Sequence, residues 1–371
     1  MKQVLMIGYA KRALEAGSRE RLRMREYADA LGGLHMIVFT LKRDGLPAEV
    51  KDGNLHVYGT NAKTRIGALW KAFRLGRAIL KDRPAKAWIV STQDPGATAL
   101  VGRAVAKGNR ATNHIQIHGD VFSLYNSRSL FARVRVWYAE RVVRTTAHIR
   151  VVSERIKRSL VSRGVAASFV TVLPIQADLS SFLTVGNVRQ YTRAQPLKFV
   201  YVGRLSPEKN VQLLIDAFEK VRKQHDCTLT IVGAGPMRSA LQSKVMQLAL
   251  TDSVTFMDWT NDIASVLAAH DVLCLSSDHE GWGMVLVEAA AAGMPVVTTD
   301  VGCAGEFVVP GVTGQVVPVG DVVAFAGAMS TYCDTPDLIR AHGQAAHAAA
   351  VQFALGEEEY LKRFVDVYTS V

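Results

Sequence analysis

The chain has 371 residues, of which 49% are hydrophobic, and this composition excludes general disorder. A chain of this length exceeds the size at which a single hydrophobic core usually stops growing, so we expect two domains. The net charge of +11 is unevenly divided, with +19 over residues 1–190 and −8 over residues 191–371. The basic first half favours acidic partners, such as anionic lipid, a polyanionic glycan or nucleic acid.

No run of about 18 or more apolar residues occurs, and the residues after Met1 predict a strand rather than a signal peptide. We therefore expect a cytoplasmic or peripheral membrane protein. The four cysteines lie far apart without a C-x-x-C pair, at Cys227, Cys274, Cys303 and Cys333. We interpret them as core thiols, with a metal or redox role as the minor alternative.

The first half alternates short apolar runs with helical patterns, which is typical of an α/β domain. The predicted strands are Val4–Gly8, Leu34–Thr40, Ala87–Ser91, Asn113–His118 and Ala147–Ser153. After the first of them, Ser18 is a predicted N-cap with Glu20 in the first turn, so Gly17 and Ser18 can present N–H groups to a phosphate. His118 ends its strand, where a structural role is the commoner one for a histidine.

Two segments of the first half mix aromatic and basic residues. In Lys63–Lys81 the apolar stripe of a predicted helix is flanked by cations; the stripe holds Ile66, Leu69, Trp70 and Phe73, and the cations are Lys71, Arg74, Arg77 and Lys81. Ser129–Arg150 repeats the mixture with Phe131, Trp137 and Tyr138. Either these are sheet-covering helices whose apolar stripes face the core, or they dock on an anionic membrane. The clustered positive charge favours the interpretation that these segments dock on an anionic membrane.

A polar, turn-rich segment, Thr184–Pro196, separates the two halves, and the strand–helix alternation restarts at Leu197. We therefore place the domains at 1–190 and 191–371, and leave open whether the last helix packs back on the first domain. This pattern predicts two doubly wound α/β domains, with ligands bound outside the carboxyl ends of the strands in a cleft between them.

Two cations, Arg204 and Lys209, follow the strand that ends at Gly203. Together they can neutralise a diphosphate, although Lys209 by itself would more often be a surface lysine. Gly233 and Gly235 follow the next strand, but the third glycine of a dinucleotide-binding fingerprint is missing.

The most informative stretch is LSSDHEGWGMVLVEAAAAGMPVV, residues 275–297. We predict a buried strand before it, a loop over Ser276–Gly283 and a helix over Met284–Ala292. Backbone N–H groups near Gly281 and Gly283 would face a bound anion. Glu280 lies in the loop and Glu288 one turn into the helix. A carboxylate among valines and alanines needs hydrogen-bond donors, which a ribose diol would supply; a solvated surface glutamate is an equal alternative.

This stretch resembles the Glu-x7-Glu signature of glycosyltransferase family 4, a retaining family with the GT-B fold. Three further segments resemble family segments in the family's order: Phe199–Phe218, Thr228–Pro236 and Gly311–Asp321. The resemblance implies a GT-B fold of two Rossmann-like domains that face each other across a cleft, with a nucleotide-diphosphate sugar as donor. It also places Phe256–Asp262 near the base.

The resemblance further implies roles for single residues. Arg204 and Lys209 would hold the leaving diphosphate, Glu280 the donor hexose and Glu288 the ribose. His118 would lie near the reacting sugar, oriented by Asp120. The implied catalytic residues are His118, Arg204, Lys209 and Glu280. The implied donor-binding residues are Gly203, Gly233, Gly235, Gly281, Trp282, Gly283, Met284 and Glu288. The implied acceptor-binding residues are Gly17, Ser18 and His118.

The sequence departs from the family pattern in three places. Gly17 stands alone where members commonly have paired glycines, which puts the acceptor contacts in doubt. Ile175-Gln176-Ala177 replaces Asn-Gly-Val, and Val301-Gly302-Cys303 stands where paired glycines are common.

No D-x-D motif occurs, so a metal-clamped diphosphate is not supported, and we predict a metal-independent enzyme without a cofactor. Arg204, Lys209 and helix N-termini would stabilise the leaving phosphate instead. We see no enzyme nucleophile of the glycosidase kind, and the resemblance implies front-face transfer with retention.

We therefore predict a hexosyltransferase that acts on a lipid-linked or membrane-surface glycan, in cell-surface polysaccharide or glycolipid synthesis, at the cytoplasmic face of an anionic membrane. The alternatives are a soluble sugar-phosphate glycosyltransferase and a nucleotide-sugar epimerase. No nucleic-acid partner is expected, because no groove-reading or single-strand motif is present.

Overall fold

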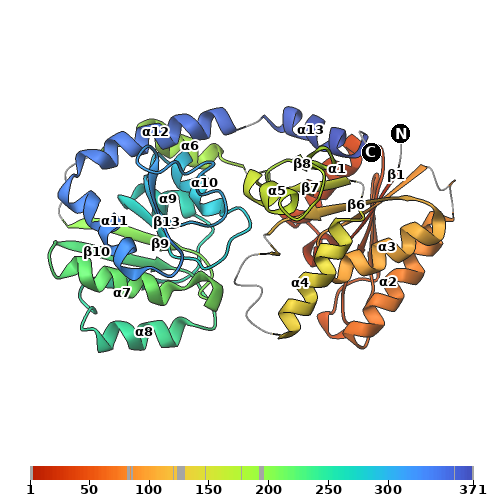
Figure 1. The fold of residues 1–371 in the computed structure, drawn as a ribbon, viewed down its shortest axis with the longest axis horizontal. Coiled ribbons are helices and arrows are strands. Elements are labelled where there is room, and N and C mark those ends of the chain that lie inside the picture. Colours follow the sequence, from red (N-terminus) through yellow and green to blue (C-terminus); the bar gives the residue numbers. More distant parts are fainter. Residues whose placement is uncertain are drawn as a thin grey trace. The chain divides into compact units, whose positions relative to one another are not determined.

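The computed structural model describes residues 3–81, 84, 87–119, 121–122, 130–146, 148–176, 178–191, 196–354 and 356–369. It divides into two compact units (Figure 1): unit 1 comprises Met1–Pro174 and Gly356–Val371, and unit 2 comprises Ile175–Leu355. The division falls after Pro174 rather than after residue 190. The reason is that the helix Ser180–Val188, α6, packs on two helices of unit 2, α9 (Ile263–Ala268) and α10 (Met284–Ala291).

Unit 1 is built on an eight-stranded sheet with the order β3-β4-β2-β1-β5-β6-β7-β8. Its strands are β1 (Gln3–Gly8), β2 (Leu34–Val38), β3 (Glu49–Asp52), β4 (Leu55–Gly59), β5 (Trp88–Thr92), β6 (Thr112–Ile117), β7 (His148–Val151) and β8 (Val170–Val172). All neighbours are parallel except β3 and β4. The sequence predicted five of these strands but missed β3, β4 and β8. β3 is a largely exposed edge strand and β8 has only three residues, so neither carries a long apolar run.

The helices of unit 1 cover both faces of this sheet. They are α1 (Arg19–Leu31), α2 (Arg65–Leu80), α3 (Ala97–Asn109), α4 (Leu130–Val143), α5 (Glu154–Val161) and α13 (Glu357–Thr369), with short 3-10 turns at Lys11–Leu14, Lys42–Asp44 and Ala167–Phe169. The predicted N-cap is confirmed, because the Ser18 hydroxyl accepts from the Arg21 N–H at 3.1 Å.

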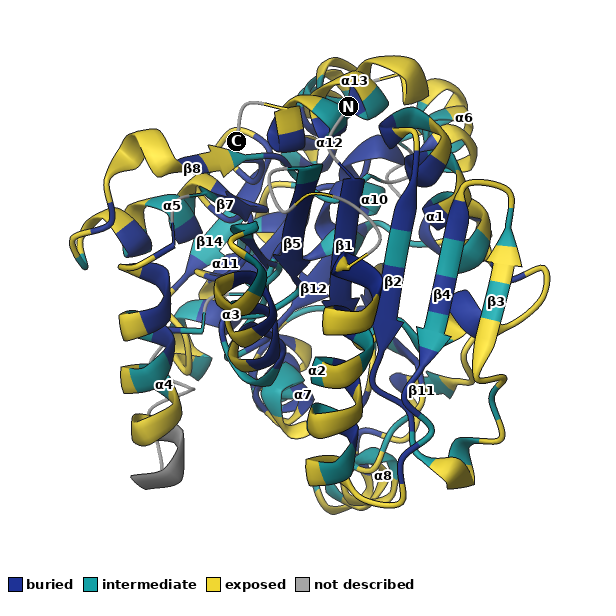
Figure 2. Cartoon of the chain, turned by 90° about the vertical axis from the view of Figure 1, so that its right-hand side faces the viewer, coloured by how far each residue is buried: buried dark blue, intermediate teal, exposed yellow. Residues whose placement is uncertain are grey.

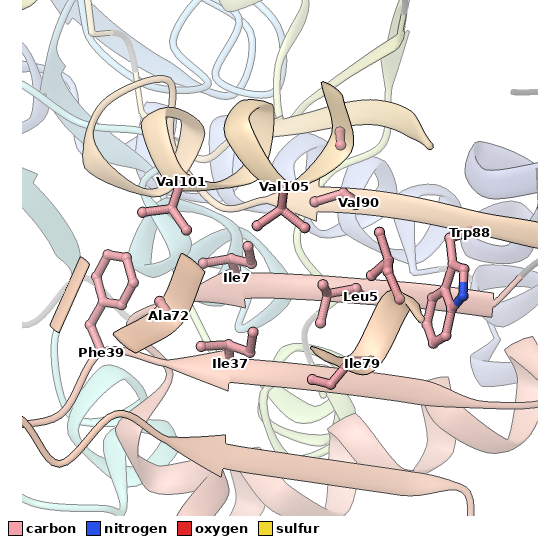
Figure 3. Close-up of a cluster of buried hydrophobic side chains, with 12 residues drawn as sticks. Leu5, Ile7, Ile37, Phe39, Ala72, Ile79, Trp88, Val90, Val101 and Val105 are labelled. Atoms are coloured by element: carbon pink, nitrogen blue, oxygen red, sulfur yellow. The ribbon is translucent and has the colours of Figure 1, made fainter. Parts of the chain in front are cut away.

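One face of the unit 1 sheet packs an apolar core against α2 and α3. Leu5 and Ile7 of β1 lie beneath Val101 and Val105 of α3 (Figure 3). Figure 2 shows these helices buried on the inner side and exposed on the outer side. The opposite face carries the alternate residues of the same strands and is covered by α1 and α13, whose Tyr27 and Phe364 rings stack at 4.1 Å.

Unit 2 is an all-parallel sheet with the order β11-β10-β9-β12-β13-β14. Its strands are β9 (Leu197–Val202), β10 (Cys227–Val232), β11 (Val254–Met257), β12 (Val272–Leu275), β13 (Val296–Thr299) and β14 (Gly314–Val317). Its remaining helices are α7 (Val211–Arg222), α8 (Arg238–Gln247), α11 (Val322–Asp334) and α12 (Asp337–Phe353), with a 3-10 turn, η6, at Pro207–Lys209. Among the described helices of the chain, none is long and apolar enough to cross a bilayer.

The strand order reverses once near the middle of each sheet. The reversal lies between β1 and β5 in unit 1 and between β9 and β12 in unit 2. In open α/β sheets, ligands bind outside the carboxyl ends of the strands at such a switch point. The loops after β9 and β12 are therefore the place to look for a ligand site in unit 2.

Candidate active site

The loops after β9 and β12 are joined by direct hydrogen bonds. The Ser276 hydroxyl donates to the Lys209 carbonyl at 3.2 Å, and the Asp278 N–H donates to the Glu208 carbonyl at 2.8 Å. The Asn210 side-chain amide, at the start of α7, donates to the Asp278 carboxylate at 2.8 Å. Main-chain and side-chain bonds thus hold the two loops in one fixed arrangement.

The centre of this arrangement is an ion pair between Lys209 and Glu280, with 2.5 Å between Nζ and Oε1. Both side chains are largely buried, at 17% and 11% exposed. The Ser277 hydroxyl donates to the same Oε1 at 2.7 Å. The structure therefore brings together two residues that the sequence assigned to different parts of the donor. A cation and a carboxylate at the switch point are suited to a ligand with both phosphate and hydroxyl groups.

Arg204 lies on the same loop but extends into solvent. Its side chain is 72% exposed, and its guanidinium is 3.8 Å from the Glu208 carboxylate. An ion pair of that length and exposure contributes little to stability. The guanidinium is thus held loosely and is free to reorient toward an anion.

Glu288 lies one turn into α10 and is half-buried. Burial raises the pKa of its carboxyl above the ordinary value. Within the described part of the chain, no side chain or backbone group donates a hydrogen bond to it, and no cation pairs with it. The protein thus leaves a partly desolvated carboxylate to which none of the described residues donates, as expected of a group whose partners arrive with a ligand.

Glycines let the loop after β10 touch the loop after β9. A Cβ on Gly233 would lie 1.9 Å from the Gly203 carbonyl oxygen, and one on Gly235 would lie 2.3 Å from the Leu205 carbonyl oxygen. Both glycines also have φ values above +150°. Their first role here is therefore close backbone packing, while their predicted contact with a donor stays a prediction.

The start of α10 also depends on a glycine. Gly283 is its N-cap with φ +82°, followed by Met284 as the first helical residue, and Gly281 lies in the loop before it. Trp282 is 5% exposed, and its indole ring stacks on the Phe353 ring of α12 with 5.8 Å between the centroids. The backbone carbonyl of Trp282 accepts a hydrogen bond from the Cys303 N–H at 2.9 Å. The Trp282 side chain is thus engaged in packing within unit 2, which the sequence did not predict.

In unit 1, His118 follows β6 and is half-buried. Burial, together with the charges of Arg150 and Arg23, lowers the pKa of its imidazole to about 3, so His118 is neutral at physiological pH. Asp120, its predicted partner, lies outside the described residues.

The predicted acceptor residues Gly17 and Ser18 precede α1. Gly17 has φ +68° with open space around its Cα. The Ser18 hydroxyl is already engaged, since it donates to the Arg12 carbonyl at 2.5 Å in addition to capping the helix. A contact of Ser18 with an acceptor would therefore use its backbone, and it stays a prediction.

The sequence interpretation missed two residues at the unit 1 switch point, Gln93 and Asp94, which follow β5. The Gln93 side-chain oxygen accepts from the Tyr9 N–H at 3.1 Å, so it joins the loops after β1 and β5. Burial raises the pKa of the Asp94 carboxyl, although Thr98 and Gly96 donate to it. Their position directly after an apolar run was a signal, but the strand order that makes it informative is not visible in the sequence.

All four cysteines are free thiols. Cys227, Cys274 and Cys303 are buried, and Cys333 is half-buried. Their burial fits the interpretation as core residues.

Comparison with known proteins supports these observations. Residues 188–348 match the family model "Glycosyl transferases group 1", and residues 23–180 match the model "Glycosyltransferase Family 4". Glycogen synthase of Mycobacterium tuberculosis is 36% identical over 158 residues, which are 42% of this chain and 38% of that protein. N-acetyl-alpha-D-glucosaminyl L-malate synthase of Bacillus anthracis is 29% identical over 172 residues, 46% of this chain and 45% of that protein. These alignments therefore span less than half of the curated relatives.

Solved structures match the whole chain. Sucrose-phosphate synthase from Thermosynechococcus elongatus has a TM-score of 0.79 at 20% identity and covers 100% of this chain and 99% of its own. HepE from Anabaena in complex with UDP has a TM-score of 0.74 at 20% identity and covers 100% of both chains. The fold of two Rossmann-like units is the GT-B fold. The two family models together span most of both units, and the chain belongs to glycosyltransferase family 4.

The packing of the glycine loops leads to a stability prediction. Gly233→Ala should lower the free energy of unfolding by about 2–4 kcal/mol, because the new methyl group meets a backbone oxygen and the φ value disfavours an L residue. The matched control is Gly327→Ala in α11, where nothing lies within 4 Å and φ is ordinary, so the fold should be unchanged or slightly more stable. Urea unfolding of both variants checks this, and equal stability of the two would contradict it.

Proposed function

We propose that this protein is a retaining, metal-independent hexosyltransferase that uses a nucleotide-diphosphate sugar and a membrane-associated, lipid-linked glycan acceptor. The observation that carries the proposal is the half-buried Glu288 carboxylate, to which none of the described residues donates a hydrogen bond, on the same segment as Glu280 of the Lys209–Glu280 pair. A ribose diol supplies two O–H donors to such a carboxylate. Two of the matched HepE structures are complexes with UDP and with UDP-glucose, and this supports a nucleotide sugar as the donor.

In the proposed complex, Lys209 and Arg204 contact the diphosphate, and Glu280 accepts hydrogen bonds from hydroxyls of the hexose. The bond between the anomeric carbon and the phosphate oxygen breaks, and a bond from that carbon to the acceptor oxygen forms. The acceptor's proton moves to the departing phosphate oxygen. Lys209 and Arg204 stabilise the charge that develops there, and electrostatic stabilisation of this kind is usually the largest single contribution to such a step. His118, kept neutral, hydrogen-bonds to the sugar rather than repelling positive charge at its anomeric carbon.

A membrane-bound acceptor is supported by the outer surface of unit 1. α2 turns Ala68, Ala72 and Gly76 toward the sheet, and Leu69 and Phe73 pack partly on the same core. Ile66 and Trp70, however, are 80% and 58% exposed, so the predicted apolar stripe is divided between the core and the solvent. The sheet-covering interpretation therefore accounts for part of this helix, and the exposed Ile66 and Trp70 support the proposed membrane contact.

α4 repeats the feature, with Val134 and Trp137 exposed by 57% and 60%. Arg74 lies over the Trp70 ring at 4.7 Å, and Arg141 lies over the Trp137 ring at 5.9 Å. Exposed tryptophans beside cations suit the interface of an anionic membrane, because the rings enter the headgroup region while the cations stay at its surface. We place the protein on the cytoplasmic face, where such lipids are enriched.

The Glu288 assignment predicts opposite effects on binding and stability. Since the folded-state pKa of Glu288 is raised, its ionisation at neutral pH opposes folding, and its contribution to stability falls as pH rises through that pKa. Glu288→Gln should therefore melt at the same or a higher temperature than the wild type at pH 7. It should also bind nucleoside diphosphates more weakly by about 1–3 kcal/mol.

The measurement is thermal unfolding with and without UDP, GDP and ADP, since a ligand of the folded state raises the melting temperature. The control is Glu219→Gln on α7, where only a surface pair with Lys223 is lost and the nucleotide response should be unchanged. If no nucleotide shifts the wild type, or if Glu288→Gln keeps the full shift, the proposed site is wrong.

The absence of a D-x-D motif and the cations at the switch point predict transfer that survives complete chelation of divalent metals. The product should keep the donor's anomeric configuration. Arg204→Ala should cost more activity than Arg204→Lys, which retains a charge near the phosphate. Assays in EDTA and NMR of the product check this; loss of activity restored by manganese, or an inverted linkage, would contradict it.

The exposed tryptophans predict salt-sensitive binding to anionic vesicles and little binding to neutral ones. Trp70→Ser combined with Trp137→Ser should reduce the bound fraction in co-sedimentation. The control is Trp259→Ser, which removes a 56% exposed tryptophan from the acidic unit 2 and should leave binding unchanged. Full activity on a soluble sugar phosphate, with no vesicle binding at low salt, would instead favour a soluble acceptor.

A further inference from the structure

A row of buried polar side chains crosses the face of the unit 1 sheet that α1 and α13 cover. Ser91 of β5, His114 and Gln116 of β6, and Arg150 of β7 are all at most 4% exposed. The register pairs Ser91 with His114 and Gln116 with Arg150, so these side chains lie next to one another on one face. His118 continues the same alternation two residues after Gln116 and leaves the sheet at its carboxyl edge.

Arg150 carries the positive charge in this row of polar side chains. Its guanidinium makes four hydrogen bonds, with donor–acceptor distances from 2.8 to 3.2 Å: to the Gln116 side-chain oxygen, the Leu173 carbonyl, the Pro174 carbonyl and the Tyr360 hydroxyl. All four acceptors are neutral. Among the described residues no carboxylate pairs with Arg150, so a buried cation is satisfied by dipoles alone.

The groups that accept hydrogen bonds from Arg150 include residues next to both places where the chain passes between the units. The chain leaves unit 1 after Pro174 and returns before Gly356. Arg150 holds the first connection by the carbonyls of Leu173 and Pro174. It holds the second through Tyr360, whose hydroxyl also donates to the Pro174 carbonyl at 3.1 Å. Farther along α13, the Tyr368 hydroxyl bonds to Gln116 at 2.9 Å.

We propose that Arg150 is a positioning residue that ties both chain connections to the strand leading into His118. Arg150 touches no substrate in this role. It acts through Gln116 and Tyr360, and through its charge on the imidazole. This inference rests on the proposed function only for its effect on catalysis, because the tether and the charge belong to the folded chain itself.

Several titratable or charged groups face Arg150 and His118 from the surrounding elements. In the described residues they are His114 of β6, His148 of β7, Arg23 and Tyr27 of α1, and Tyr360 and Tyr368 of α13. Burial raises the pKa of Tyr27, and it raises the pKa of Tyr368 to about 12, so both hydroxyls are uncharged at neutral pH. Arg23 and Arg150 are therefore the lasting charges near His118, and both disfavour its protonation.

The test uses three variants of the full chain, and a fourth variant serves only to assign the NMR signal. Arg150→Gln removes the charge but keeps amide donors of similar reach. Tyr360→Phe keeps the charge and removes one hydroxyl that bridges the two connections. Arg158→Gln, on the exposed side of α5, is the matched control and should behave like the wild type. Histidine ring NMR, assigned with His118→Gln, follows the protonation of His118, and amide hydrogen exchange follows α13.

In Arg150→Gln the titration midpoint of His118 should move up toward its ordinary value, and the amides of α13 should exchange about tenfold faster. In Tyr360→Phe the midpoint should stay where it is while α13 exchanges faster. If Arg150 had only a structural role, Arg150→Gln would speed the exchange of α13 without moving the His118 titration midpoint. If Arg150→Gln does not fold, Tyr360→Phe decides, and wild-type exchange of its α13 overturns the tether. An unchanged His118 midpoint in folded Arg150→Gln overturns the proposal.

Kinetic measurements of sugar transfer test the part of the inference that depends on the proposed function. In Arg150→Gln, kcat should fall about tenfold on the acid side of the pH profile, with the donor KM little changed. If the wild type transfers no sugar, the proposed function fails, while NMR and exchange still decide the role of Arg150.

Discussion

The contact on which unit 2 depends is the docking of the loop after β12 onto the loop after β9. Lys209 and Glu280 form a largely buried pair there, and Ser276, Ser277 and Asp278 supply further hydrogen bonds. Removing one partner of such a pair costs about 3–5 kcal/mol, because the other charge is left without compensation. The same pair faces the switch point of the sheet. One interaction thus fixes the loop that leads to α10 and presents a cation and a carboxylate where ligands of this fold bind.

Some residues around this contact serve packing within the fold, and others remain for a ligand. Gly233 and Gly235 are committed to close packing, and the Trp282 indole is committed to Phe353. Glu288 is the exception, since burial raises its pKa and the described residues offer it no donor. A group that weakens the unliganded fold and has no partner among the described residues is best explained by a ligand. In unit 1, Arg150 differs from Glu288, because it is a buried charge with four hydrogen bonds to neutral groups of the chain.

Much of this architecture could be predicted from the sequence, because the strands of a parallel sheet are short apolar runs separated by helices. Five strands of unit 1 and the strands β9, β10 and β12 of unit 2 were predicted in this way, and the helix predicted over Met284–Ala292 is α10. The direct pairing of Lys209 with Glu280 was not, since the residues are 71 positions apart and meet only because β9 and β12 are neighbours. For the same reason Gln93 and Asp94 were missed. The structural division after Pro174 differs from the predicted domain boundary at residue 190, because the polarity of a segment does not show which unit its helix, α6, packs on.

The most direct test of the central claim is a crystal structure of the chain with a bound nucleoside diphosphate. We expect the ribose hydroxyls within hydrogen-bond distance of the Glu288 carboxylate, and the diphosphate in contact with Lys209 and Arg204 beside the start of α10. A nucleotide bound elsewhere in unit 2, or a Glu288 carboxylate still without a ligand contact in the complex, would contradict the account.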